Sequence, residues 1–482
     1  MDDDILQVIE EERANNHSIE EMKIALTQRG FQDEDIQEAL RKVGHTLTGG
    51  AESSRKRNIR LFTAKEVLDR VGYGFAPNQF VNILFYQTAM GAGLGHLALF
   101  FVGLFNGLKS VISVRISALL QDYSKVKQIS KKTVGYGGIL FGFSFLFMAF
   151  ARSIHSVWLF AGALLIGSVG VVSYGDLYNQ LLRSSLKKER MGAFLSRISQ
   201  FGVLLTAACI LASGWLMETI PATGKMIGLA GFSFSAYGYL IAFEVTAFAF
   251  IISGYVLSRV KQQASDLKYR FSTFLKEHHG RVRGQARRFF SNKYTVLLLI
   301  ASVLSGAVQS LGNSFYGIFI YSRFENALLG GFLNVAVIYA VAVLVSFIGP
   351  WVTRRLNRSI GYSPMLVFGT LLIAMMPAVA AWNPNFYALG AANALSIIGA
   401  AIVGAAQGLL ARKLLKEDER KLYFASLSFM VTIPFIILLP LGAWLAQAEG
   451  LTFLFRILTY VMVAGVVPLY LVLVAMANKR RL

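Results

Sequence analysis

Long apolar runs separated by short charged turns fill the chain from about residue 75 to its end. A run of about 20 apolar residues is long enough to cross the hydrocarbon core of a bilayer as a helix. The pattern predicts twelve such spans, at 75–94, 97–121, 133–151, 155–182, 193–217, 232–258, 294–320, 329–352, 362–381, 386–411, 424–446 and 452–476. We therefore expect an all-α polytopic membrane protein.

The second half of the chain repeats features of the first at an offset of about 230 residues. The matching positions are Gln79 and Gln309, Tyr86 and Tyr316, and the turns Glu189-Arg190 and Glu419-Arg420. Internal repeats in membrane transporters build two bundles around a central site that opens alternately to either side. We therefore expect two pseudo-symmetric six-helix bundles, 71–260 and 293–482, joined by a basic cytoplasmic loop, 261–292.

The amino-terminal residues 1–46 have a different composition, with short amphipathic patterns in place of long apolar runs. Spacings such as Ile5 to Ile9 and Met22 to Leu26 predict three short helices in a small cytoplasmic module. Three short helices with a turn at Gly30 resemble a ubiquitin-associated (UBA-like) bundle, which implies a protein partner for residues 1–46. The alternative is a small cap without a ligand. A linker and an amphipathic lead-in lying on the membrane are expected over 47–70.

The net charge of +20 is concentrated in the turns that follow every second span. The opposite turns hold only Arg152, Lys225 and Arg323. Because cytoplasmic turns of membrane proteins are rich in Lys and Arg, both termini are predicted to be cytoplasmic. We expect an integral protein of the cell or inner membrane. Basic residues confined to turns between spans do not form the solvated face that nucleic-acid binding needs, so no nucleic-acid partner is expected.

The turns after the second and eighth spans carry parts of one motif, Gly-x-x-x-Asp-Arg-x-Gly-Arg-Arg. The matching residues are Ala118, Asp122, Tyr123 and Lys127 in the first turn, and Gly349, Arg354 and Arg358 in the second, where Thr353 replaces the acid. With two six-span halves and a long central loop, residues 70–480 resemble the major facilitator superfamily. The resemblance implies a secondary transporter that moves a small solute by rocker-switch alternating access, with a proton or cation as a possible coupled ion.

Polar side chains inside apolar spans mark candidate positions for a cavity, because polar groups in hydrocarbon need a partner or water. In the seventh span, polar residues advance by three or four and share one helical face. The resemblance implies that the first, fourth, seventh and tenth spans line the cavity. The substrate-cavity candidates are Asn78, Asn82, Gln87, Lys109, Gln309, Asn313, Tyr316 and Asn393. The alternative is hydrogen bonding that only holds the helices together.

Charged residues within the spans are candidates for gating or coupling, since each is costly in the bilayer. The candidates are Arg115, Asp176 and Glu244 within the spans, together with Asp122 and Arg354 in the two motif-bearing turns. Arg115 and Asp176 each lie seven residues before a cytoplasmic turn, so we predict that they pair in a gate or relay, or as a static ion pair. Lys109 can hold an anionic group of the solute. Glu244 can carry a coupling proton or support its bundle.

No combination of residues points to catalysis, a cofactor or a metal site, so we expect neither an enzyme nor a cofactor. A single cysteine, Cys209, excludes an internal disulfide. Two other functions remain open at this stage. One is a non-transporting membrane sensor or scaffold that anchors the amino-terminal module, and the other is a lipid translocator.

Overall fold

A computed structural model of the chain describes residues 8, 26, 27, 31, 56–126, 130–185, 188–220, 224–229, 232–261, 274 and 289–479. The chain forms two compact units, Met1–Leu61 and Phe62–Leu482. The helical module expected over 1–46 lies almost entirely outside the described residues, as does most of the basic loop expected over 261–292. The second unit is built from long helices.

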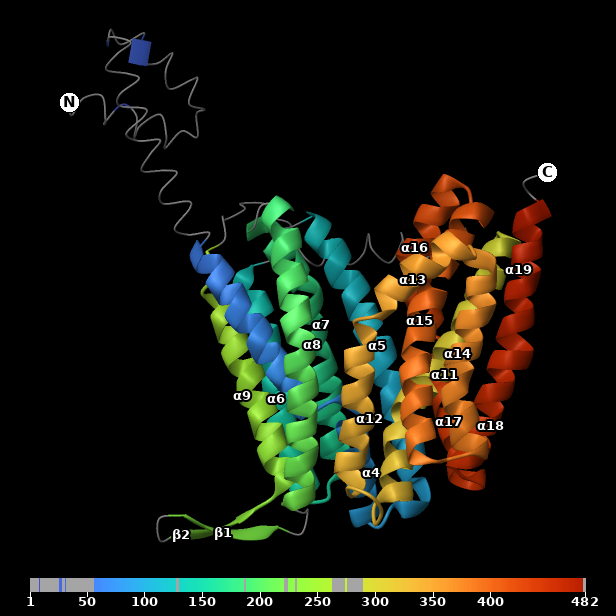
Figure 1. Ribbon diagram of the computed structural model, residues 1–482. Helices are drawn as coiled ribbons and strands as arrows, with labels where there is room; N and C mark the ends of the chain where they lie inside the picture. The colour runs from blue at the N-terminus through green and yellow to red at the C-terminus, as the bar shows by residue number, and fades with distance from the viewer. Residues whose placement is uncertain are drawn as a thin grey trace. The chain divides into compact units, whose positions relative to one another are not determined.

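In the first half of the second unit, the described residues form seven helices and one hairpin, coloured blue to green in Figure 1. The helices are residues 62–75, α4 (Asn78–Gly91), α5 (Ala98–Val126), α6 (Lys131–Ser153), α7 (Val157–Ser185), α8 (Lys188–Thr219) and α9 (Gly238–Ser258), with a short 3-10 turn η1 (Gly95–Leu97). Strands β1 (Lys225–Leu229) and β2 (Phe232–Ala236) pair antiparallel between α8 and α9.

The second half, coloured yellow to red, repeats this arrangement with more breaks in its helices (Figure 1). Its elements are α11 (Lys293–Phe324), α12 (Gly331–Ser346), α13 (Gly349–Ser359), α14 (Tyr362–Trp382), α15 (Phe386–Leu414), α16 (Glu417–Thr432), α17 (Phe435–Glu449), α18 (Leu451–Tyr460), the π-helical η2 (Val461–Val466) and α19 (Val467–Lys479). We call the end of the unit that carries α13 and α16 the basic end, and the opposite end the hairpin end.

Ten helices of the described residues are long and apolar enough to cross a membrane, and α12 with α13 make an eleventh crossing with a bend of 49°. The first crossing is made of two pieces. The 14 residues of α4 cover about 21 Å at 1.5 Å per residue, which is less than the roughly 30 Å of hydrocarbon in a bilayer. Residues 62–75 precede α4 and can supply the remaining length. The expected all-α membrane fold is confirmed.

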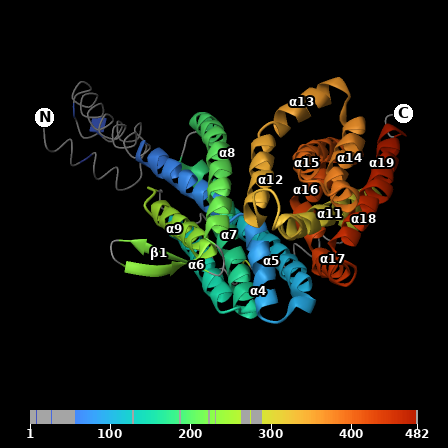
Figure 2. The same ribbon diagram turned by 60° about the horizontal axis from the view of Figure 1, so that its bottom comes forward.

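Helix packing follows the same plan in both halves, as the repeat predicts. In the first half α6 packs on α7 and α9, and in the second half α14 packs on α15 and α18. Between the halves, α5 packs on α17 and α8 packs on α12 (Figure 2). The counterpart of α5 in the second half is α12, and the counterpart of α8 is α17. The α5–α17 contact and the α8–α12 contact are therefore equivalent. The two bundles are therefore related by a pseudo-twofold axis.

The lead-in expected on the membrane surface is wrong for residues 62–71, which are part of the first crossing. Phe62 is fully buried, and the Lys65 and Asp69 side chains are almost fully buried. Lys65 Nζ lies 2.9 Å from Asp69 Oδ2, one helical turn away. The segment can be buried in the bundle because these two charges pair with each other. In the sequence, charged residues that alternate with apolar ones look like an amphipathic helix on the membrane surface, which is why the prediction was wrong.

Candidate functional site

The first crossing is broken where it reaches the middle of the unit. Pro77 has no amide hydrogen to continue a helix, and it disfavours helical geometry at the residue before it. Two neighbouring helices donate to backbone carbonyls near the break: Ser213 Oγ donates to Phe75 O at 2.6 Å, and Thr246 Oγ1 donates to Gly72 O at 3.2 Å. The helix therefore restarts as α4 with Asn78 in its first turn.

A cavity of about 470 Å³ lies between the two bundles at this break. Its polar lining residues are Tyr73, Asn78, Gln79, Thr206, Gln309, Asn313, Tyr316, Tyr339, Ser346, Asn393 and Ser396. The described lining contains no Lys, Arg, Asp or Glu side chain. Amides and hydroxyls both donate and accept hydrogen bonds, so this wall suits an uncharged polar molecule.

Asparagines from both bundles connect behind the wall of the cavity. Asn82 is almost fully buried on α4; it accepts a hydrogen bond from Asn106 Nδ2 at 3.1 Å and donates to the carbonyl of Asn313 at 3.3 Å. Lys109 Nζ donates to Asn78 Oδ1 at 2.8 Å. Lys109 is not part of the lining, and it contacts the lining residue Asn78.

Three buried polar atoms of the lining have no hydrogen-bond partner among the described residues. They are the hydroxyls of Thr206 on α8 and Tyr339 on α12, and the amide nitrogen of Asn393 on α15. Leaving such groups unpaired costs about 1–3 kcal/mol each. Groups of this kind on facing walls of a cavity are positioned to bind a solute or water that enters it.

Five of the eight predicted cavity residues line the cavity: Asn78, Gln309, Asn313, Tyr316 and Asn393. Asn82 and Lys109 lie directly behind the lining. Gln87 lies more than one turn beyond Asn82 on α4 and is not part of the lining. Their roles in substrate binding stay predictions.

Tyr339 and Ser346 were not predicted as cavity residues, although they lie seven residues apart on one face of α12. Thr206 of α8 was also outside the candidate set. The family resemblance placed the first, fourth, seventh and tenth spans at the cavity, so the fifth and eighth spans were passed over. Each of these three residues is polar within an otherwise apolar span, and that feature of the sequence could have marked it as a cavity candidate.

The predicted pair of Arg115 and Asp176 is not formed in this structure. The guanidinium of Arg115 faces the ring of Phe429 in the other half, at 5.9 Å from the ring centre. Arg115 is exposed on α5, and the ring that it faces belongs to α16.

The other gating or coupling candidates lie outside the cavity. Asp122 is in the last two turns of α5, Glu244 is half-buried on α9, and Arg354 is exposed on α13. The Nε atom of Arg354 donates to the Pro350 carbonyl at 3.3 Å. Their functional roles stay predictions. Among the residues that the structure describes, no group of three or more His, Cys, Asp or Glu side chains is arranged to hold a metal ion.

The first bundle also contains a buried polar network that the sequence analysis missed. Asp69 accepts hydrogen bonds from Tyr174 and from Ser253 Oγ, the latter at 2.8 Å. Lys65 Nζ lies over the ring of Tyr178 at 3.4 Å from its centre. These contacts join the first crossing to α7 and α9 within one bundle, so the network supports that bundle.

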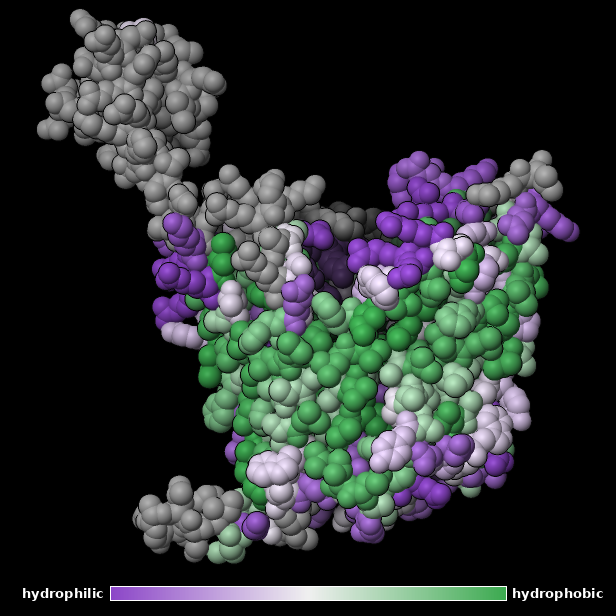
Figure 3. Space-filling view, in the orientation of Figure 1, coloured by the Kyte–Doolittle hydropathy of each residue, from purple (hydrophilic) through white to green (hydrophobic). Residues whose placement is uncertain are grey.

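At the hairpin end the two bundles are in direct contact. Gln447 of α17 accepts a hydrogen bond from Leu99 N at 2.9 Å and donates to Gly95 O at 3.2 Å. Glu218 accepts a hydrogen bond from Phe332 N at 3.0 Å. At the basic end a hollow separates the two halves (Figure 3). The unit is therefore closed at the hairpin end and hollowed at the basic end.

No known protein family and no curated protein matches this sequence. Solved structures do match. A mutant of the nucleoside transporter NupG superposes with a TM-score of 0.64 at 13% identity, covering 86% of this chain and 99% of that chain. A bacterial homologue of the iron transporter ferroportin in its inward-facing state gives 0.62 at 16% identity, covering 87% and 98%. The peptide transporter POT in complex with sulfate gives 0.58 at 14% identity, covering 88% and 94%.

The chain has the fold of these membrane transporters. At such low identities the likeness extends to the fold and not to the substrate. The expected fold, two packed bundles of membrane-crossing helices, is thereby confirmed. Together with its membrane-crossing helices, it identifies the chain as an integral membrane protein.

Proposed function

We propose that this protein is a secondary transporter that moves a small, uncharged, polar solute by alternating access. The observation that carries the proposal is the cavity between the bundles, in which every polar side chain of the described lining is an uncharged amide or hydroxyl. Its volume of about 470 Å³ lies within the 300–1,000 Å³ range of small-molecule sites. A charged solute would find no opposite charge on the described wall, whereas a sugar- or nucleoside-like molecule would find many hydrogen-bond partners.

The arrangement of the bundles supports alternating access. The cavity is lined by helices of both bundles, which touch at the hairpin end and are separated by a hollow at the basic end. Parting the hairpin end and closing the basic end would expose the same residues to the other side. We further propose, from the positive-inside rule, that the basic end faces the cytoplasm, so that the structure represents an inward-open state.

A binding screen on the purified full-length protein tests this proposal. Nucleosides and neutral sugars are compared with dipeptides, organic anions and organic cations by the thermal shift that each produces. A solute present at 100 times its dissociation constant stabilises the folded state by about 2.7 kcal/mol. We expect stabilisation by a neutral polar class, followed by uptake of that solute in proteoliposomes.

Thr206→Val removes one of the unpartnered hydroxyls of the cavity and should weaken the solute-dependent shift. Thr219→Val is the matched control, because the Thr219 hydroxyl bonds a carbonyl of its own helix at 2.9 Å and lies outside the lining. Stabilisation by charged solutes alone would contradict the proposed substrate class. Proteoliposomes that take up no solute but exchange lipids between leaflets would indicate a lipid translocator.

A further inference from the structure

The short helix α13 differs from the rest of the eighth crossing. It follows α12 after a bend of 49°, so its 11 residues leave the direction of α12 (Figures 1 and 2). One face of α13 is fixed against α15: Gly349 and Thr353 are buried, and a Cβ added at Gly349 would lie 3.2 Å from Ala401. The opposite face is exposed.

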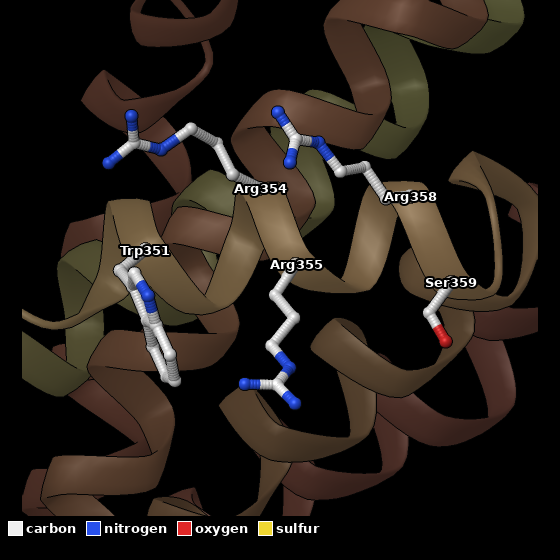
Figure 4. Close-up of a pocket in the computed structure, with 5 residues that line it drawn as sticks. All are labelled: Trp351, Arg354, Arg355, Arg358 and Ser359. Atoms are coloured by element: carbon white, nitrogen blue, oxygen red, sulfur yellow. The ribbon is translucent and has the colours of Figure 1, made fainter.

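The exposed face is basic and aromatic. Trp351, Arg354, Arg355 and Arg358 are all exposed, and they line a cavity of about 560 Å³ together with Ser359 (Figure 4). Figure 4 shows Arg354 and Arg358 on one side of the helix and Trp351 with Arg355 on the other. The guanidinium of Arg355 lies 5.6 Å from the centre of the Trp351 ring.

These three arginines have no acidic partner in the part of the chain that the structure describes. The helix itself contains no Asp or Glu. Three guanidiniums within five residues repel one another unless an anion lies between them. Arginine presents a planar fork of donors that matches the oxygens of a phosphate. The uncompensated charge therefore favours a phosphate-bearing ligand.

The position of α13 indicates where that phosphate comes from. In Figure 3 the hydrophobic belt of the unit gives way to hydrophilic residues at the level of α13. Tryptophan is enriched at this membrane–water boundary, and amphipathic helices with arginines on the polar face lie in it. Anionic phospholipids hold their phosphates at the same depth, and they are abundant in the cytoplasmic leaflet.

We propose that α13 binds the headgroup phosphate of an anionic phospholipid from the leaflet at the basic end. Arg354 and Arg358, on the same side of α13, hold the phosphate, and Arg355 adds positive charge beside Trp351 at the boundary with the acyl chains. Basic residues that only set the topology would attract the leaflet as a whole. The cavity among these side chains instead predicts a lipid that stays bound when the surrounding membrane is removed.

The test uses the full-length protein, delipidated in neutral detergent and titrated with phosphatidylglycerol or phosphatidylcholine, with bound lipids counted by native mass spectrometry. Wild-type protein should retain phosphatidylglycerol in preference to phosphatidylcholine. Replacing all three arginines by glutamine should weaken phosphatidylglycerol binding by about 100-fold, from about 1 kcal/mol per basic residue. A triple arginine-to-lysine variant keeps the charge and should keep much of the preference.

The matched control removes three charges elsewhere at the basic end, by Lys413→Gln, Lys416→Gln and Lys421→Gln, and should retain the lipid. If the triple glutamine variant does not fold, Arg355→Gln alone should weaken binding by about fivefold. Equal binding of both lipids by wild-type protein, or equal losses in the α13 and control variants, would overturn the proposal. Displacement of the lipid by millimolar inorganic phosphate would assign the site to free phosphate instead.

Discussion

Close contacts of glycines across the hairpin end predict how the conformational balance can be shifted. Gly103 of α5 lies against α17, where an added Cβ would overlap Ala443 and lie 2.9 Å from the carbonyl oxygen of Leu439. Gly214 of α8 lies in the same way against Ala336 of α12. These two contacts belong to helix pairs that the pseudo-twofold axis exchanges. Gly103→Val therefore places three carbon atoms where the bundles meet.

The size of the effect follows from overpacking. A Cβ closer than 3.0 Å to another heavy atom forces something to move, and overpacked sites typically cost about 1–3 kcal/mol. Here the bundles can relieve the overlap by parting at the hairpin end, so the cost falls on the closed state and not on folding. A shift of about 1–3 kcal/mol changes the ratio of the two states by about 5–150-fold.

The assay measures access to the cavity from the hairpin side. In a Cys209→Ser background, Asn313→Cys places a single thiol in the cavity, and sealed vesicles are treated with a membrane-impermeant thiol reagent. Gly103→Val should raise the labelling rate from the hairpin side by about 5–150-fold. Gly162→Val is the control, because nothing lies within 4 Å of a Cβ added there. Equal labelling rates in the two variants would refute the argument.

Three further predictions concern polar contacts between helices or within the first crossing. Ser213→Ala should lower the free energy of unfolding by about 1–3 kcal/mol, because the Phe75 carbonyl at the helix break loses its donor; chemical denaturation measures this. Asp69→Asn leaves the buried Lys65 without its acidic partner and should lower the free energy of unfolding by about 3 kcal/mol, which a thermal melt would show as a lower melting temperature. The double variant Lys65→Met, Asp69→Leu removes both charges and should recover most of the lost stability. Gln447→Leu removes two hydrogen bonds across the hairpin end and should raise the same thiol-labelling rate several-fold, with no change expected from the basic side.

The membrane fold was predictable because its causes are local and repeated. Apolar runs of about 20 residues give the spans, and the recurrence of Gln79 as Gln309 points to duplicated bundles. Residues such as Asn313 and Asn393 could be chosen as cavity candidates because an amide in hydrocarbon needs a partner or water.

The remaining features depend on contacts between distant residues. Lys65 and Asp69 look like surface charges in the sequence, and only their enclosure by Tyr174 and Ser253 shows that they are buried. The direction in which Arg115 points, toward Phe429, depends on how far the bundles are apart. Neither the bend before α13 nor the opening at the basic end has a signal in the spacing of apolar residues.

The uncharged wall of the cavity has an electrical consequence. Each elementary charge that crosses a membrane exchanges about 2.3 kcal/mol with the field per 100 mV. A neutral solute held only by amides and hydroxyls crosses without electrical work. Its steady-state accumulation should therefore stay the same when the membrane is depolarised, unless an ion bound elsewhere travels with it.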